Sequence, residues 1–440
     1  MIITMRFVIF VMIITLAGKS AHAQQQERWI VLDKESAGVA VQSITGQSLV
    51  GAPRFELISL ADPTLVAPPP ITDENLRVAR IDATAVGELQ SIMHGPRFKR
   101  CGGFTVHESR AAALAEPRNP FYDAAYLHGP IKFSTNIQKQ ELVGHALVSV
   151  KAENIISSIE KLMKYETRDH NTEGGKKSAE DLEKDWKKFG EGRKDYSVDH
   201  IEHEGWLQNS VVATIKGTDL DGELVVIGAH LDSINRSNIK KAPGADDDAS
   251  GVAVVTEILR ILTKLEDFKP RRTIKFFAYA AEEYGLLGSG EIAKTYSQAI
   301  KSGTGDIKEV VAVLQLDMAG FAGADRHMYF IDDYVSTELT DYLKKLIHVY
   351  NGPGDHEITF GNTTCGYACS DHGSWTKYGF RAAFPFESTF AKLNPKIHTP
   401  DDTVANLDTS GVHQSRFARL GLEFAIEVGY AAPSSEPSAQ

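Results

Sequence analysis

The stretch GELVVIGAH, residues 222–230, is an almost unbroken apolar run, which predicts a strand buried on both faces. A helix-periodic apolar segment follows at residues 250–265, and a second apolar strand follows at residues 272–280. Buried strands that alternate with helices are typical of a largely parallel sheet. We therefore predict an α/β fold with a mixed, largely parallel central sheet and helices on both faces.

The same alternation extends outward from this stretch, from about residue 148 to the C-terminal region. Helices are predicted at residues 152–165, 177–190, 285–300, 337–350 and 414–430, and strands at residues 209–217, 309–317 and 380–386. We place this domain at residues 131–432, before a flexible tail at residues 433–440.

Residues 24–130 have a different character. Strand-like runs at residues 27–36 and 54–62 precede a proline-rich run and a poorly periodic stretch that ends near residue 104. The segment is either a small independent domain or a prosegment that assists folding or masks a site before proteolysis. We predict the prosegment, with an activating protease as a partner.

The first 23 residues predict export. Arg6 precedes an apolar run at residues 7–17, and the small-x-small pattern AHA ends the segment. These features are those of a secretory signal peptide with a cut before Gln24. The apolar run is too short to span a bilayer, so no membrane anchor is expected in the mature form. The protein is expected to be secreted or periplasmic.

Composition and cysteines limit the partners. The formal net charge is −11, and no Lys/Arg-rich run has interleaved aromatic residues, so no nucleic-acid partner is expected. Export permits disulfides. Cys365 and Cys369 are close enough to bridge across a tight turn that contains Gly366, and Cys101 is left over. A monomer is expected.

Acidic residues and histidines stand where the predicted strands end. They are His230 and Asp232, then Asp246, Asp247 and Asp248 in the following loop, Glu282 and Glu283, Asp317, and His398 in a later loop. Singly, each has an ordinary explanation, such as a turn former or, at Asp248, a helix cap. Together they predict one site, because ligands bind beyond the carboxyl ends of the strands in such sheets.

The predicted site holds more negative charge than a buried cluster tolerates without compensation. A pair of divalent metal ions removes this conflict, and histidines with carboxylates suit zinc or a harder first-row ion. One shared carboxylate can hold two such ions close together. The triple-Asp loop therefore predicts a bridging ligand.

Six motifs carry a resemblance to a known family. They are GAHLDS (228–233), APGADDDASG (242–251), AYAAEEYGLLGS (278–289), LQLDM (314–318), CGYACSDHGSW (365–375) and PFES with NPKIHTPDDT (385–388, 394–403). In this order they resemble the co-catalytic zinc aminopeptidases, and most of all the bacterial secreted leucyl aminopeptidases. The resemblance covers residues 148–430 and implies a zinc-exopeptidase, phosphorylase/hydrolase-like fold.

The resemblance also implies a role for each candidate. Asp247 would bridge two Zn²⁺ ions, His230 and Asp317 would complete one ion, and Glu283 and His398 would complete the other. Those five positions are the implied metal ligands.

Two further positions match the family around these ligands. Glu282 matches the general base, and Asp232 matches an acid that orients the histidine ligand two residues before it. A cis peptide is implied between Asp247 and Asp248. The residues 401–408 after His398 have the composition of a solvated turn, in which either Asp401 or Asp402 could support His398.

The resemblance places a pocket for the first substrate side chain at seven positions, and matches the Cys365–Cys369 pair to a disulfide-clamped loop. The pocket residues are Met318, Ile331, Tyr367, Phe384, Phe386, Phe390 and Ile397. Tyr367 would help to polarise the scissile carbonyl.

The implied function is a secreted di-zinc aminopeptidase that removes apolar, Leu-like N-terminal residues from peptides or proteins. A metal-bridging hydroxide would be the nucleophile. Three alternative functions compete with this one: a glutaminyl-cyclase-like enzyme with one zinc, a carboxypeptidase, and a binding protein without catalysis. The complete ligand set disfavours the first and third, and no basic anchor for a C-terminal carboxylate supports the second.

Overall fold

The computed structural model describes residues 27–47, 52–60, 73–95, 97–98, 103–107, 109–235, 237–354 and 356–434. The predicted signal peptide, Cys101 and the tail from residue 435 lie outside the described residues. Within the described part of the chain, no helix is long and apolar enough to cross a membrane. The chain divides into two compact units, Met1–Phe98 with Gly103–Asn119, and Lys99–Gly102 with Pro120–Gln440.

The N-terminal unit contains an antiparallel sheet with the strand order β2-β3-β1-β4. Its elements are β1 (Glu27–Asp33), α2 (Lys34–Ser43), β2 (Phe55–Ile58), β3 (Leu76–Asp82), α3 (Val86–Met93), β4 (Phe104–His107) and α4 (Arg110–Ala115). Ile30, Ile81 and Leu89 are fully buried in its core. The predicted strand at 27–36 stops at Asp33, whose carboxylate accepts the first main-chain N–H groups of α2.

Strand β3 and helix α3 fall in the stretch that looked poorly periodic in the sequence. The reason is that β3 is buried along almost its whole length although it contains Arg80 and Asp82. The Arg80 guanidinium pairs with Glu27 at 2.8 Å and with Glu56 at 3.2 Å. Ion pairing with neighbouring strands therefore hides the apolar pattern that marks a strand.

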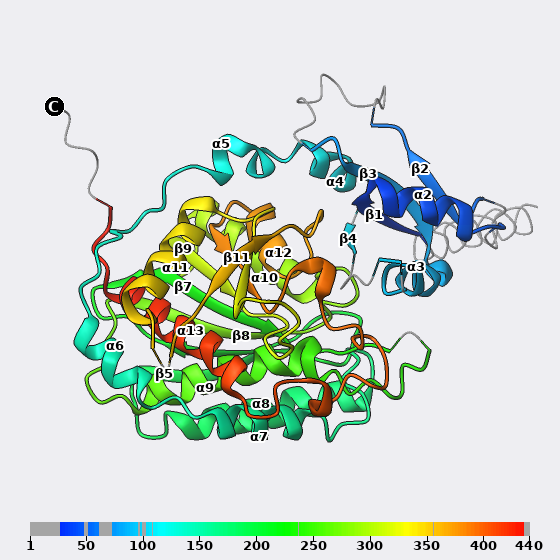
Figure 1. The fold of residues 1–440 in the computed structure, drawn as a ribbon. Helices are drawn as coiled ribbons and strands as arrows, with labels where there is room; N and C mark the ends of the chain where they lie inside the picture. Colours follow the sequence, from blue (N-terminus) through cyan, green and yellow to red (C-terminus); the bar gives the residue numbers. More distant parts are fainter. Residues whose placement is uncertain are drawn as a thin grey trace, which may run out of the picture. The chain divides into compact units, whose positions relative to one another are not determined.

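The second unit is built on a six-stranded mixed sheet with the order β12-β9-β7-β8-β6-β5 (Figure 1). Its strands are β5 (Tyr196–Ile201), β6 (Ser210–Ile215), β7 (Leu220–His230), β8 (Arg272–Tyr279), β9 (Glu309–Gln315) and β12 (Ala382–Ala383). Strands β12, β9, β7 and β8 are parallel, and β6 and β5 continue the sheet antiparallel. The predicted mixed, largely parallel sheet is confirmed.

Helices cover both faces of this sheet, as the apolar strands predicted. Val225 and Ile227 of β7 belong to a core shared with α7, α9 and α13, whereas Val226 belongs to a core shared with α10 and α12. The helices are α5 (Ala124–Leu127), α6 (Gln140–Leu147), α7 (Ala152–Leu162), α8 (Glu173–Phe189), α9 (Gly251–Lys264), α10 (Leu287–Ser302), α11 (Thr337–Tyr350), α12 (His372–Lys377) and α13 (Val412–Tyr430).

The single strand predicted at residues 380–386 is wrong in one respect. It is divided into β12, which pairs with β9, and β13 (Pro385–Phe386), which pairs with a separate small sheet. That sheet has the order β11-β10-β13, with β10 (Met328–Ile331) and β11 (Phe360–Thr363). Pro385 has no N–H group to continue the first ladder, so the chain changes sheets there.

Candidate active site

Three parallel strands of the central sheet end at one edge, and candidate residues follow each of them. They are His230 at the end of β7, Glu282 and Glu283 after β8, and Asp317 after β9. Asp247 comes from the loop between β7 and α9, and His398 comes from the loop before α13. All six side chains are buried.

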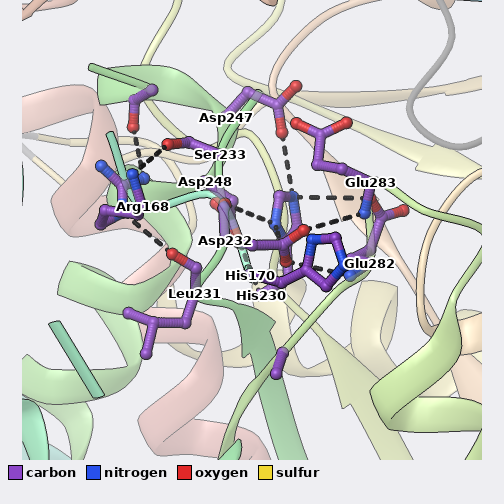
Figure 2. Close-up of polar contacts among 12 residues, drawn as sticks. Arg168, His170, His230, Leu231, Asp232, Ser233, Asp247, Asp248, Glu282 and Glu283 are labelled. Atoms are coloured by element: carbon purple, nitrogen blue, oxygen red, sulfur yellow. Dashed lines mark hydrogen bonds and ion pairs between the residues drawn. The ribbon is translucent and has the colours of Figure 1, made fainter. Parts of the chain in front are cut away.

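Asp247 lies between the two histidines. Its Oδ1 atom is 2.9 Å from Nε2 of His230, and its Oδ2 atom is 2.7 Å from Nε2 of His398 (Figure 2 shows the first contact). Nε2 of His230 is also 3.5 Å from Oδ1 of Asp317. Nε2 of His398 is 3.3 Å from Oε2 of Glu283. The five sequence-predicted ligands therefore form two clusters that share one carboxylate.

Asp248 also lies near the first cluster, since its carboxylate, His230 and Asp317 have ligand atoms within 4.8 Å of one another. Its oxygens, however, accept main-chain N–H groups from Gly251 at 2.7 Å, His230 at 3.1 Å and Met318 at 3.2 Å. The peptide bond between Asp247 and Asp248 is cis, as the resemblance implied. Asp247 thus contacts two imidazoles, whereas Asp248 contacts main-chain N–H groups.

Asp232 contacts both strand ends. Nδ1 of His230 is 3.1 Å from the Asp232 carbonyl oxygen and 3.4 Å from its carboxylate. The same carboxylate accepts the main-chain N–H groups of Glu282 at 2.9 Å and Glu283 at 3.1 Å. The shorter contact makes the carbonyl the better acceptor for the imidazole, so the carboxylate mainly fixes the loop after β8. The sequence indicated the contact of Asp232 with His230, but not its bonds to the main chain of Glu282 and Glu283.

Glu282 differs from the other acids of the site. Within the described part of the chain, neither of its carboxylate oxygens has a hydrogen-bond partner, although the side chain is buried. The imidazole of His230 faces it, with Nε2 4.0 Å from Oε2 of Glu282. Burial raises the pKa of Glu282 well above the ordinary glutamate range, against the opposing charge of His230 and with added repulsion from Glu283.

The two histidines lie in a strongly negative environment. Burial disfavours the charged imidazole, but Asp317 and Glu282 outweigh it and raise the pKa of His230 well above its usual range. Burial acts in the same way at His398, where Glu283 and Asp247 raise the pKa to about 10. A site that attracts protons so strongly also attracts metal cations, and its nitrogen and oxygen donors fit zinc.

Asp402, four residues after His398, supports the loop that carries Asp247. The carboxylate of Asp402 accepts main-chain N–H groups of Asp246 at 3.1 Å and Asp247 at 3.2 Å. Asp401 is exposed and pairs with Lys396. The sequence did not distinguish Asp401 from Asp402 as a support for His398. The contacts show that Asp402 instead holds the main chain of the triple-Asp loop.

The predicted pocket residues lie in one buried apolar cluster. It contains Met318, Ile331, Cys365, Tyr367, Cys369, Phe384, Phe386, Leu393 and Ile397, with Phe390 packed against it. A disulfide joins Cys365 to Cys369. No sequence pattern pointed to Asp333, which is half-buried after β10 and accepts N–H groups of Cys365 at 3.0 Å and Gly366 at 2.6 Å.

Comparisons with known proteins agree with this geometry. The model of a family described as peptidase family M28 matches residues 210–421. Leucine aminopeptidase 1 of Coccidioides posadasii is 36% identical over 332 residues, covering 72% of this chain and 81% of that protein. Leucine aminopeptidase 1 of Grosmannia clavigera is 38% identical over 319 residues, covering 69% of this chain and 74% of that protein.

A solved structure extends the likeness to the fold. The crystal structure of the Legionella pneumophila LapA aminopeptidase is similar with a TM-score of 0.71 and 27% sequence identity, and covers 92% of this chain and 98% of that one. The resemblance inferred from the six motifs is confirmed. The chain belongs to peptidase family M28 and is a metallo-aminopeptidase.

Proposed function

We propose that this enzyme is an exported aminopeptidase that removes apolar, Leu-like N-terminal residues and binds two Zn²⁺ ions per chain. The observation that carries the proposal is the position of Asp247, whose two carboxylate oxygens face His230 and His398. One carboxylate between two imidazoles is the arrangement that a ligand shared by two ions requires. Aminopeptidases of this family depend on zinc.

The side chains divide between the two ions by proximity. His230 and Asp317 would hold one ion, Glu283 and His398 the other, and Asp247 both. When bound, the ions would lower the pKa of a water molecule and polarise the scissile carbonyl. The contact of His230 Nδ1 with the main chain leaves Nε2 directed at the metal site, as in other histidine ligands.

Glu282 is the proposed general base. It accepts the proton of the attacking water and later delivers it to the leaving amine. Its main-chain N–H bond to Asp232 holds it in place. Its carboxylate is buried beside the proposed ligands, where water is the natural partner for its oxygens.

Substrate binding would use the remaining groups. The Tyr367 hydroxyl would donate to the developing oxyanion. The free α-amine of the substrate would lie by the carboxylates of the other half of the site, which accounts for cleavage one residue at a time. The apolar cluster around Met318 and Phe384 would hold a medium-to-large apolar side chain such as Leu, Met or Phe.

Hydrolysis of Leu-p-nitroanilide tests this function directly. We expect release that stops on treatment with a chelator and returns with zinc, is slower for Glu-p-nitroanilide, and is absent for N-acetyl-Leu-p-nitroanilide. The blocked compound is the matched control, because it differs only in the α-amine. Release that is insensitive to the chelator, or equal for the blocked compound, would contradict the proposal.

We further propose that residues 1–23 are removed on export and that a protease removes residues 24–130, leaving a monomeric domain at 131–432. The division of the chain into a compact unit of Met1–Phe98 with Gly103–Asn119 and a second unit supports a removable segment. Mass spectrometry of the exported, active protein should give an N-terminus near residue 131. A fully active product that begins at Gln24 would overturn the prosegment.

A further inference from the structure

Arg168 is a fully buried cation with no role in the proposed chemistry. It lies in the connection between α7 and α8 and is 0% exposed. In the described part of the chain, its guanidinium donates to main-chain carbonyl oxygens of Leu231 at 2.9 Å, Pro243 at 2.6 Å and Gly244 at 2.9 Å. Three acceptors around one planar group match the fork of donors that only arginine offers.

These three carbonyl groups belong to the two segments that carry adjacent metal-ligand candidates. Leu231 directly follows His230, and Pro243 and Gly244 begin the loop that leads to Asp247. Figure 2 shows Arg168 beside Leu231 and Ser233, on one side of the carboxylate cluster. Arg168 therefore links the end of β7 to the start of the triple-Asp loop.

A second set of contacts strengthens the same link. The main-chain N–H of Arg168 donates to Oγ of Ser233 at 3.1 Å, and that hydroxyl donates to the carbonyl of Ala242 at 2.7 Å. Gly244 has a left-handed conformation, with φ of 52°, and a Cβ atom there would lie 2.9 Å from the Arg168 guanidinium. The triple-Asp loop therefore packs closely against the Arg168 side chain at Gly244.

The charge of Arg168 also acts on the site. Burial lowers the pKa of Arg168, but Asp402, Asp248 and Asp232 oppose that shift, and a guanidinium remains protonated in proteins. Repulsion among buried carboxylates is costly in a medium of low polarity. A fixed positive charge behind them reduces that cost, with or without metal.

We propose that Arg168 is a positioning residue that fixes the separation of His230 and Asp247 and thereby raises the affinity of the site for metal ions. The inference rests on the proposed two-metal function. Arg168 acts through the main chain on either side of the ligands, because its guanidinium bonds are to carbonyl oxygens of neighbouring residues.

Arg272 provides a matched control. It is also fully buried, and it donates to the carbonyl oxygens of Val428, at 2.9 Å, and Ala431. It pairs with Glu223 at 2.7 Å. Arg272 begins β8, at the opposite end of that strand from the candidate site. Its removal should therefore disturb folding stability without reaching the metal ligands.

The experiment compares the full chain with R168K, R168M and R272M. Three quantities are measured: the zinc Kd by competition with a chromophoric chelator, the absorption spectrum of the cobalt-substituted protein, and the Tm of the metal-free protein. We expect R168M to bind zinc about 10–100-fold more weakly, as for other residues that orient metal ligands. R168K should be intermediate, because it keeps the charge and loses the fork.

R272M should lower the Tm of the metal-free protein and leave the zinc Kd and the cobalt spectrum unchanged. Unchanged zinc affinity in both Arg168 variants would overturn the inference, as would an equal loss of affinity in R272M. If R168M does not fold, the zinc Kd of R168K alone decides: weaker binding than in the parent chain supports the inference, and unchanged binding overturns it. If the parent chain binds fewer than two ions, the proposed function fails and this inference fails with it.

Discussion

At the scale of single residues, the acids of the site differ in what their oxygens contact. Asp232 and Asp248 each accept main-chain N–H groups, and so act mainly as supports for the loops. Asp247 instead faces two imidazoles, and Glu282 contacts no hydrogen-bond donor of the described residues. In the proposed function, Asp232 and Asp248 would therefore maintain the geometry of the site, Asp247 would hold the ions, and Glu282 would move the proton.

The variant E282Q tests the role of the base. The amide has the same shape and cannot accept the proton, so we expect kcat to fall about 10²–10⁴-fold. Zinc content and Tm should stay close to those of the parent chain. D401N is the control, because Asp401 is exposed and pairs only with Lys396 among the described residues. An E282Q enzyme as active as D401N would exclude Glu282 as the base.

At the scale of elements, the loop after β10 is bound to the disulfide loop through two neighbouring acids. Asp333 is half-buried and accepts the N–H groups of Cys365 and Gly366. Asp332 is exposed and accepts the Thr364 hydroxyl at 2.6 Å. Asp333 therefore holds the main chain next to Tyr367, whereas Asp332 makes an exposed contact with a side chain.

These two acids give a matched pair of variants. D333A should lower kcat/KM for Leu-p-nitroanilide by about 10–10²-fold, because a small displacement of the loop moves groups that position substrate. D332A should leave kcat/KM nearly unchanged. Steady-state kinetics of both variants check this, and equal effects would show that the Asp333 contact has no special part in catalysis.

His413, in the first turn of α13, gives that helix a pH dependence. Burial lowers the pKa of His413 to about 4, and Arg416 adds to the shift. The folded chain therefore keeps the imidazole neutral while the unfolded chain takes up a proton below pH 6.5. Stability should fall as the pH drops from 6.5 to 4, and should not change through this group above that range.

Denaturation of the metal-free parent and H413L measures this effect. Across that pH range the parent should lose about 3 kcal/mol more of its free energy of unfolding than H413L. Leucine cannot take up a proton, so the difference between the two curves isolates this histidine. Parallel curves would show that His413 is not the cause.

At the scale of the whole molecule, the sequence was most informative where local pattern and fold agree. The run at residues 222–230 became β7, and the acids beyond the strand ends lie together because parallel strands end at one edge. The separation of β12 from β13 was missed because Pro385 changes the sheet inside one apolar run. Strand β3 was missed because Arg80 interrupts its apolar pattern, and the acids that pair with Arg80 lie on other strands.

The contacts that Asp402 and Arg168 make at the site could not be predicted, because their partners are distant in the chain. Asp402 bonds to Asp246, which is 156 residues away, and Arg168 bonds to Gly244, which is 76 residues away. An isolated arginine or a second aspartate has no local pattern that reveals such contacts. The ligand candidates were predictable because each follows an apolar strand or lies in a dense acidic motif.

The central claim is that Asp247 is shared between two metal ions held by residues distant in the sequence. The most direct test is elemental analysis of the purified, active protein, normalised to protein concentration. The account predicts two zinc ions per chain, with activity rising as the second ion is bound. One ion or none in fully active protein would contradict it.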